Sequence, residues 1–247
     1  MRGNNSGHRK RSAVEVSDTV NRIMKDLKTN ANAEFKAGEE KLGINVSKAY
    51  GVPIPALRSI ARRTGIDSGV ADALWKTGVH EARMLASMVY DPDSMTENRM
   101  DSLVKDVDSW DLCDTCCAEL FSKTVYADKK IGDWTARNEE YVKRAGFVMI
   151  AYKALRDPDA SNSDFRVLFK DIIDASSDDR NYVKKAVSWA LREIGKRNIT
   201  LNRDVIGIAE ELQKSEVQSA QWIAKSVLSE LKSDRVQNRL RAQTGHR

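Results

Sequence analysis

One short pattern recurs in the second half of the chain at intervals of about 40 residues. It consists of an aromatic residue, an aliphatic residue, one or two basic residues and a small residue, and it begins at Tyr141, Tyr182 and Trp222. Recurrence at a fixed period of about 20 to 50 residues indicates a repeat protein, in which one supersecondary unit is stacked on the next. We therefore expect successive units to bury equivalent helix faces against each other.

The rest of the sequence also favours helices. The 247 residues include only 13 Gly and 4 Pro, and no stretch shows the sustained apolar and polar alternation of a half-buried strand. Helical periodicity and breaker residues predict helices over residues 14–30, 31–42, 55–64, 68–77, 80–90, 96–107, 110–122, 128–136, 139–155, 164–176, 180–196, 202–212, 217–231 and 234–242. The motif period fits the ~40 to 47 residues of HEAT and armadillo helix pairs. We predict an all-α solenoid of antiparallel helix pairs, with the repeated bases on its concave face.

A single folded domain is expected over residues 13–243. Residues 1–12 are basic and lack an apolar core, which predicts a disordered arm and not a signal peptide. Residues 244–247 are expected to fray. The longest apolar run, from Ala145 to Tyr152, is far shorter than the roughly 20 residues of a membrane helix. We therefore expect a cytoplasmic protein outside the membrane, which the reduced state expected of three clustered cysteines also favours.

The charge and the absent motifs narrow the possible functions. A net charge of +5 hints at a polyanionic partner, although a slightly basic protein without one has the same composition. No glycine-rich phosphate loop is present, so we expect no nucleotide cofactor. Only His80 among the histidines lies within the predicted fold, and we expect it to be structural. Cys113, Cys116 and Cys117 lack a second pair of ligands, so we expect buried thiols and no metal.

Two tryptophans lie beside charged residues. At helical spacing, Asp114 lies one turn after Trp110 on the same face. Trp189 lies about 200 degrees around its helix from Val187, a residue of the apolar stripe. Three basic residues share the side of Trp189: Lys185, Arg192 and Lys196. An aromatic ring beside a carboxylate and another within a basic stripe favour the binding of a cationic group against a phosphate backbone.

Arg144 lies on a predicted helix that is apolar on nearly every side, so its guanidinium needs a partner. One interpretation is a buried ion pair with an acid such as Asp114 or Glu139. The other is a guanidinium presented to phosphate from a rigid helix. The sequence weighs these two alternatives about evenly.

Several segments together resemble the DNA alkylation repair family, in its AlkD-like branch of HEAT-repeat DNA glycosylases. The resemblance covers nearly the whole chain, although the residues before Tyr50 match nothing sharply. Its ordered set of segments is far more specific than any one of them. They are Tyr50 to Arg58, Leu74 to Arg83, Ser109 to Asp114, Val142 to Ala145 and Lys184 to Glu193.

This resemblance implies a C-shaped, right-handed superhelix that grips duplex DNA in a concave basic groove and hydrolyses the N-glycosidic bond of N3- or N7-alkylated purines. Carried over by position, Trp110 and Trp189 would flank the sugar of the lesion, with Asp114 as the catalytic carboxylate. Arg144, or the adjacent Lys143, would lie near the phosphates. The basic stripe of Lys185, Arg192 and Lys196 would add further DNA contacts. We expect a monomer that uses no cofactor.

The chemistry is consistent with one well-placed carboxylate. An alkylated purine is positively charged and leaves readily, so the enzyme need not protonate it. What remains is to stabilise the oxocarbenium-like sugar and to orient water, which a carboxylate such as Asp114 does by its charge. Tryptophan faces add cation-π attraction.

Two other functions compete with this one. A HEAT-repeat module that binds damaged or distorted DNA without turnover would have the same fold and groove. A scaffold for acidic proteins would explain the charge and the period, but not tryptophans placed off the apolar stripe. Asp114 together with Trp110 and Trp189 favours the enzyme.

Overall fold

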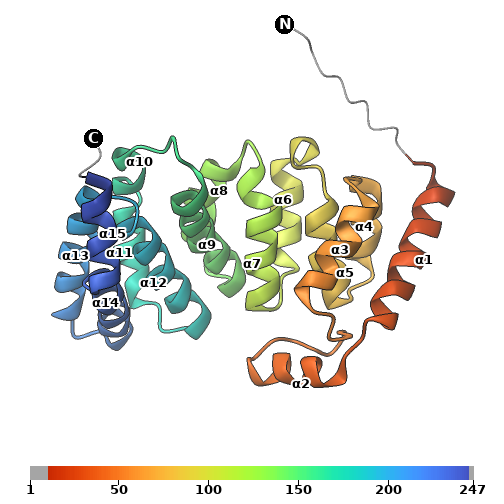
Figure 1. The fold of residues 1–247 in the computed structure, drawn as a ribbon, viewed down its shortest axis with the longest axis horizontal. Coiled ribbons are helices and arrows are strands. Elements are labelled where there is room, and N and C mark those ends of the chain that lie inside the picture. Colours follow the sequence, from red (N-terminus) through yellow and green to blue (C-terminus); the bar gives the residue numbers. More distant parts are fainter. Residues whose placement is uncertain (1–10, 245–247) are drawn as a thin grey trace, which may run out of the picture. The chain divides into compact units, whose positions relative to one another are not determined.

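The computed structural model describes residues 11–244, which form helices joined by short loops and contain no strand (Figure 1). The all-α prediction is therefore confirmed. The chain divides into two compact units, the first ending at Met95 and the second beginning at Thr96. Residues 1–10 of the predicted basic arm and residues 245–247 of the predicted frayed end lie outside the described residues. Every described helix is too short or too polar to span a bilayer.

The first unit is built mainly from helix pairs. Its elements are α1 (Ala13–Thr29), α2 (Ala33–Lys41), α3 (Ile54–Thr64), α4 (Ser68–Lys76), α5 (His80–Val89) and the short 3-10 helix η1 (Pro92–Ser94). A capping box at Ser12 and Glu15 starts α1. α4 packs against both α1 and α5, and α3 packs against α5. The apolar faces of these four helices therefore share one core.

A buried carboxylate holds the loop between α2 and α3 through hydrogen bonds to the loop backbone. Glu81 is fully buried, and its Oε1 accepts backbone N–H bonds from Tyr50, Gly51 and Val52 at 2.7, 2.5 and 3.2 Å. Gly51 has a φ of 76°, and a Cβ there would collide with the carbonyl oxygen of Asn32. This segment, which carries part of the family resemblance, thus has a structural reason for its sequence.

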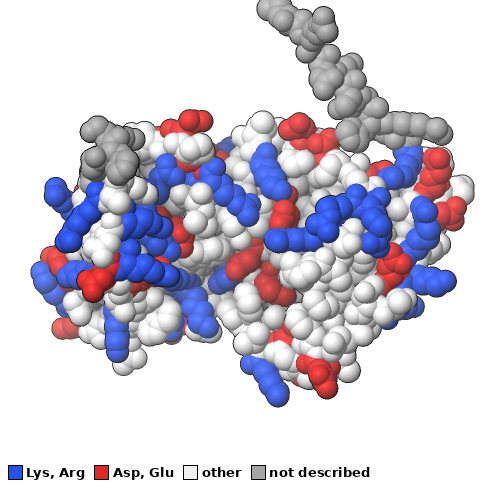
Figure 2. Space-filling model, viewed as in Figure 1, with Lys and Arg blue, Asp and Glu red and all other residues white. Residues whose placement is uncertain are grey.

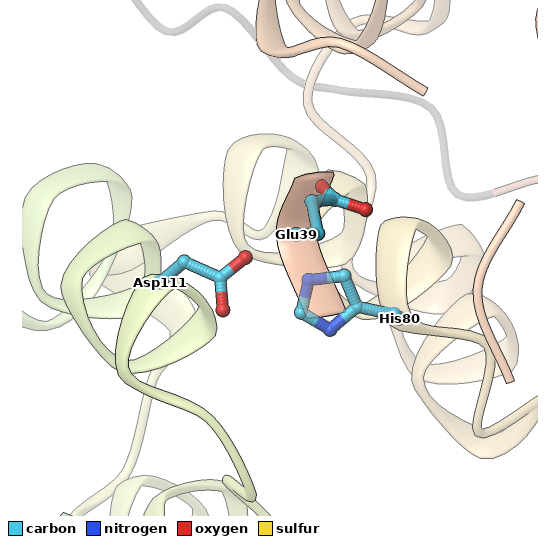
Figure 3. Close-up of side chains that lie close together, drawn as sticks. All are labelled: Glu39, His80 and Asp111. Atoms are coloured by element: carbon cyan, nitrogen blue, oxygen red, sulfur yellow. The ribbon is translucent and has the colours of Figure 1, made fainter. Parts of the chain in front are cut away.

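Beside that loop, two polar side chains pack α2 against α5. A carboxylate oxygen of Glu39 and a ring nitrogen of His80 lie within 4.8 Å of each other, and Figure 3 shows the two side chains close together. Both residues are buried, and the backbone N–H of His80 donates to the carbonyl of Lys48 at 2.8 Å. Next along α5, the guanidinium of Arg83 lies 5.5 Å from the ring centroid of Trp75.

The second unit holds the remaining elements. They are α6 (Glu97–Lys105), α7 (Trp110–Glu119), η2 (Phe121–Lys123), α8 (Ala127–Thr135), α9 (Glu140–Arg156), α10 (Asn162–Arg166), α11 (Phe169–Asp174), η3 (Ala175–Ser177), α12 (Asn181–Gly195), α13 (Ile199–Gln213), α14 (Gln218–Leu231) and α15 (Asp234–Thr244). One difference from the sequence prediction concerns residues 164–176, which form α10 and α11 instead of one helix. α10 starts at Asn162, two residues before the predicted start, because Ser161 and Asp164 form a capping box.

The repeated motif of the sequence marks α9, α12 and α14. α12 packs against both α9 and α14, so the three helices are consecutive neighbours. The rings of Tyr141 and Tyr182, which begin two copies of the motif, stack at 5.9 Å. Hydrogen bonds recur across these helices between residues 38 apart, from Arg144 to the carbonyl of Tyr182 and between Ser188 and Ser226. The sequence period therefore reflects a regular step from one helix to the next.

α9 lies at the centre of the second unit's core. Ten of its residues are buried, including Arg144 and an unbroken run from Ala145 to Ala151. A Cβ at Gly146 would lie 2.7 Å from the backbone nitrogen of Thr135, so a glycine is needed where α8 crosses α9. The prediction of a helix buried on nearly every side is confirmed, and α9 provides a rigid support for the polar groups at its surface.

Candidate active site

Asp114 lies on α7 and is held by the guanidinium of Arg144 on α9. Arg144 donates from Nε to Oδ1 at 3.0 Å and from Nη2 to Oδ2 at 2.9 Å. Its Nη1 donates to the backbone carbonyl of Tyr182 on α12 at 2.6 Å. Arg144 thus ties three helices together. Of the two acids considered as partners from the sequence, Asp114 is the one that binds, whereas Glu139 pairs with Arg137.

Burial controls the electrostatics of this ion pair. The side chain of Arg144 is 6% exposed and that of Asp114 is 21% exposed, so both charges are largely removed from water. Burial raises the pKa of the Asp114 carboxyl above its ordinary value, while the charge and hydrogen bonds of Arg144 oppose that rise. The nearby charge of Asp111 adds to the rise. An ionised Asp114 therefore depends on Arg144.

The local sequence explains where Asp114 points. Ser109 is the buried N-cap residue of α7, and its hydroxyl donates to the carboxylate of Asp111 in the first turn at 2.7 Å. Trp110 is the first residue of α7 and is half-buried. Asp114 follows one turn later on the same face, as the spacing predicted. Trp110 and Asp114 therefore share one side of α7.

Trp189 on α12 is half-buried, in agreement with its predicted place off the apolar stripe. Its indole N–H donates to Glu193 Oε1 at 3.0 Å. Tyr152 of α9 meets it edge-on, with ring centroids 5.4 Å apart and an interplanar angle of 76°. The geometry of Trp189 is thus set by Glu193 on its own helix and by Tyr152 on the neighbouring one.

Tyr152 is a residue that sequence reasoning missed. Burial raises its pKa to about 12, and the charge of Asp114 contributes to that rise. The guanidinium of Arg156 lies 4.4 Å from its ring centroid. Tyr152 is thus linked electrostatically to Asp114 and by ring contact to Trp189. Its position eight residues after Arg144, just over two helical turns, is the sequence signal that could have placed it near that arginine.

The predicted basic residues are mostly paired with acids of the protein. Lys196 donates to Glu193 at 2.7 Å and to Glu230 at 2.8 Å. Arg192 donates to the other oxygen of Glu230 at 2.6 Å. Glu230 lies opposite Arg192 at the 38-residue step, and no motif of the sequence marks it.

The other two predicted lysines differ in whether an acid within residues 11–244 binds them: Lys143 is paired and Lys185 is not. Lys143 donates to Asp178 at 3.0 Å, and Arg180 binds the same carboxylate. These contacts hold the pKa of Asp178 well below its ordinary value. Lys185 is exposed and, among the described residues, has no such acid partner. Lys185 is therefore the predicted DNA contact that the structure leaves most available.

The cysteines next to Asp114 support the helix packing. Cys113, Cys116 and Cys117 are buried and not joined in disulfides, as expected. The thiols of Cys113 and Cys117 face the carbonyls of Tyr141 and Ala145 on α9, at 3.6 and 3.7 Å. Burial raises the pKa of the Cys117 thiol well above its usual range. These contacts link α7 to α9, and the Cys117 thiol is a poor nucleophile.

Comparisons with known proteins agree with this architecture. The model of a family described as "DNA alkylation repair enzyme" matches residues 23–217. No curated protein matches the chain. A solved structure described as "A new family of proteins related to the HEAT-like repeat DNA glycosylases with affinity for branched DNA structures" superposes with a TM-score of 0.73 at 19% identity, covering 86% of this chain and 95% of that one. This likeness establishes the HEAT-like helical fold.

Proposed function

Because the chain belongs to the family of DNA alkylation repair enzymes, we propose that it hydrolyses the N-glycosidic bond of N3- and N7-alkylated purines in duplex DNA. The observation that carries the proposal is the carboxylate of Asp114, held in fixed geometry by Arg144. A carboxylate that is removed from most of the solvent and cannot rotate freely is suited to stabilising a developing positive charge.

The reaction needs little more than this charge. The alkylated base is already cationic, so it departs as a neutral purine without a general acid. The sugar becomes oxocarbenium-like, and the negative charge of Asp114 stabilises it and orients the attacking water. Water adds to the anomeric carbon, and the proton that it loses passes to solvent. The faces of Trp110 and Trp189 add cation-π attraction to the same transition state. Asp114 must be ionised throughout.

Arg144 is given a positioning role in this mechanism. Its Nε, Nη1 and Nη2 are all engaged with Asp114 and the Tyr182 carbonyl, which favours orientation of the carboxylate over contact with phosphate. It also keeps Asp114 ionised against the effect of burial. The DNA backbone is then bound by the exposed Lys185, and by Arg192, Lys196 and Lys143 if they exchange their acid partners for phosphates.

The test is release of 7-methylguanine or 3-methyladenine from methylated duplex DNA. Asp114→Asn should lower the single-turnover rate by about 100-fold or more, because it removes a preorganised charge. Duplex binding should stay nearly unchanged. Asp128→Asn is the matched control, since Asp128 is an exposed carboxylate of the same unit whose ion pair with Lys153 lies on the surface. That variant should release base at the wild-type rate.

A second function is favoured by the acid partners of the basic residues. Three of the predicted DNA contacts, Lys143, Arg192 and Lys196, are bound to carboxylates. In this second function the protein binds distorted DNA and does not hydrolyse it. The structural relative is described as having affinity for branched DNA. Wild-type protein that binds methylated duplex but releases no base under sustained single-turnover conditions would contradict the glycosylase proposal and support this one.

A further inference from the structure

We propose that the exposed face of α14 around Trp222 is a second nucleic-acid site, which binds single-stranded DNA by stacking an unpaired base on the indole ring. Trp222 is 41% exposed, in contrast to the largely buried Trp75 and Trp134. It lies apart from the Asp114 site in its contacts, because its ring contact is with Lys184 of α12. The inference thus goes beyond repair of duplex DNA.

The repeat explains why this ring is left open. The same motif position is occupied by Tyr141 on α9, Tyr182 on α12 and Trp222 on α14, and α12 packs against the other two helices. The first two rings stack on each other at 5.9 Å, so each covers part of the other's face. Trp222 instead meets the ammonium of Lys184 with its ring, and a large part of the indole remains in contact with solvent. An exposed ring of this kind can stack a flat aromatic ligand.

One lysine contacts the indole, and two more are exposed on the same two helices. The Nζ of Lys184 lies 5.1 Å from its ring centroid. Lys225 lies three residues after Trp222 on the same helix face and is exposed, as is Lys185 on α12. Farther along α14, Glu230 is occupied by Arg192 and Lys196. Figure 2 shows Lys and Arg side chains gathered over α12 to α15 on the face in view.

This combination matches single-stranded nucleic acid better than an acidic peptide. Every base has a flat face that stacks on an aromatic ring whatever its identity, and the phosphates on either side of it require cations at nearby positions. An acidic peptide would use the lysines but would leave the indole without a flat partner. In duplex DNA the bases are stacked on each other, so the ligand has to be unpaired.

The experiment measures binding of a labelled oligothymidine of about 16 nucleotides by fluorescence anisotropy. Trp222→Ala should weaken binding by about 5- to 150-fold, the range expected for loss of one stacked base. Trp222→Phe keeps a stacking ring and should lose less. Phe35→Ala is the matched control, because Phe35 is 39% exposed and lies in the other unit. It should bind as the wild type does.

A second probe separates stacking from charge. An abasic oligonucleotide of the same length has the phosphates without the bases, so Trp222→Ala should not change its binding. Lys225→Ala should reduce the salt dependence of binding to both probes by about 0.7 for each phosphate that is no longer neutralised. Lys214→Ala, which removes an exposed lysine paired with Glu211, should not.

Two results would overturn the inference. One is oligothymidine binding that Trp222→Ala leaves unchanged. The other is an equal loss with the abasic probe, which would mean that the surface recognises charge alone, as an acidic peptide site would. Thermal melting monitored by circular dichroism establishes that each variant is folded. Base release from methylated duplex is measured in parallel and should be unchanged in Trp222→Ala. The two measurements therefore test the single-strand site and the proposed catalytic site independently.

Discussion

Two groups of ion pairs in the second unit join neighbouring helices in similar ways but in different surroundings. In the first, Asp114 receives a single cation, Arg144, which is almost fully buried. In the second, Glu230 receives two cations, Arg192 and Lys196, whose side chains are 28% and 18% exposed. Burial raises the pKa of Asp114. Although burial alone would also raise the pKa of Glu230, hydrogen bonds from Lys196 and Arg192 lower it.

The difference shows how one type of interaction serves two purposes. The negative charge of a carboxylate with one cation and little water around it is weakly screened. Such a charge can stabilise a cationic transition state. A carboxylate with two partly exposed cations is readily ionised, and its cations can exchange it for phosphate at modest cost. The first group is therefore suited to stabilising a developing cation, and the second to an exchangeable contact with phosphate.

The largest effect is expected from Arg144→Met. Removing the guanidinium leaves the Asp114 charge buried without its partner, which typically costs about 3 to 5 kcal/mol of unfolding free energy. Urea denaturation at neutral pH measures this loss. The double variant Arg144→Met with Asp114→Asn should recover a substantial part of it, because the unpaired charge is then gone. A loss no larger than that of Arg192→Met would contradict the distinction between the two groups.

Tyr152 links the two groups, since the charge of Asp114 contributes to its raised pKa and its ring touches Trp189. The indole of Trp189 donates to Glu193, which shares Lys196 with Glu230. Tyr152→Leu removes the ring that orients Trp189 and should lower kcat for base release by about 10- to 100-fold, as expected for a misplaced catalytic group. KM should change little. Tyr152→Phe keeps the ring and should restore the rate. If Phe is as slow as Leu, the hydroxyl and not the ring contact is responsible.

The fold was largely predictable because local signals agree with it. Scarce Gly and Pro, helical periodicity and a motif near a 40-residue period placed most helices within a few residues. The break between α10 and α11 was missed because Val167 and Leu168 continue an apolar pattern without a Gly or Pro. Val167 is in fact 72% exposed, so the apolar residue there does not mark a core face.

The site was predictable only in part. Helical spacing placed Asp114 beside Trp110, but for Arg144 it left open an ion pair with an acid such as Asp114 or Glu139 and a contact with phosphate. The packing of α7 against α9 brings Asp114 to Arg144, and no local pattern encodes it. Glu230 and Tyr152 were missed for the same reason. Their contacts depend on the step between packed helices, which is 38 residues from Arg192 to Glu230 and 37 residues from Tyr152 to Trp189. This step differs from the motif period of 40 to 41 residues because it joins side chains at different heights.

The rate of base release should depend on pH through the ionisation of Asp114. Base release needs ionised Asp114, so its rate should fall as pH drops through a pKa that lies above the ordinary 3.8. Arg144→Lys should move this acid limb little, whereas Arg144→Met should move it to higher pH. Rates measured across acidic pH, corrected for spontaneous depurination, test this. An acid limb that Arg144→Met leaves in place would mean that another group titrates.

Stability should follow the opposite signs in the two groups. The raised pKa of Asp114 means that the folded state holds its proton more tightly, so this residue's contribution to stability falls as pH rises through the folded pKa. The lowered pKa of Glu230 means that its contribution is present above the unfolded pKa and is lost as pH falls through the folded one. Denaturation of Asp114→Asn and Glu230→Gln across acidic pH should therefore diverge from the wild type in opposite directions.

The smallest effect is expected from Glu230→Gln. Loss of two partly exposed ion pairs should cost about 1 kcal/mol or less of unfolding free energy. Arg192 is released and Lys196 keeps only its bond to Glu193, so both become more available to phosphate. Duplex affinity should therefore rise, and its salt dependence should steepen by about 0.9 for each additional phosphate that they neutralise. Glu211→Gln changes the net charge equally, at an exposed pair with Lys214. An equal rise in affinity from that control would show that net charge, and not release of these two bases, is responsible.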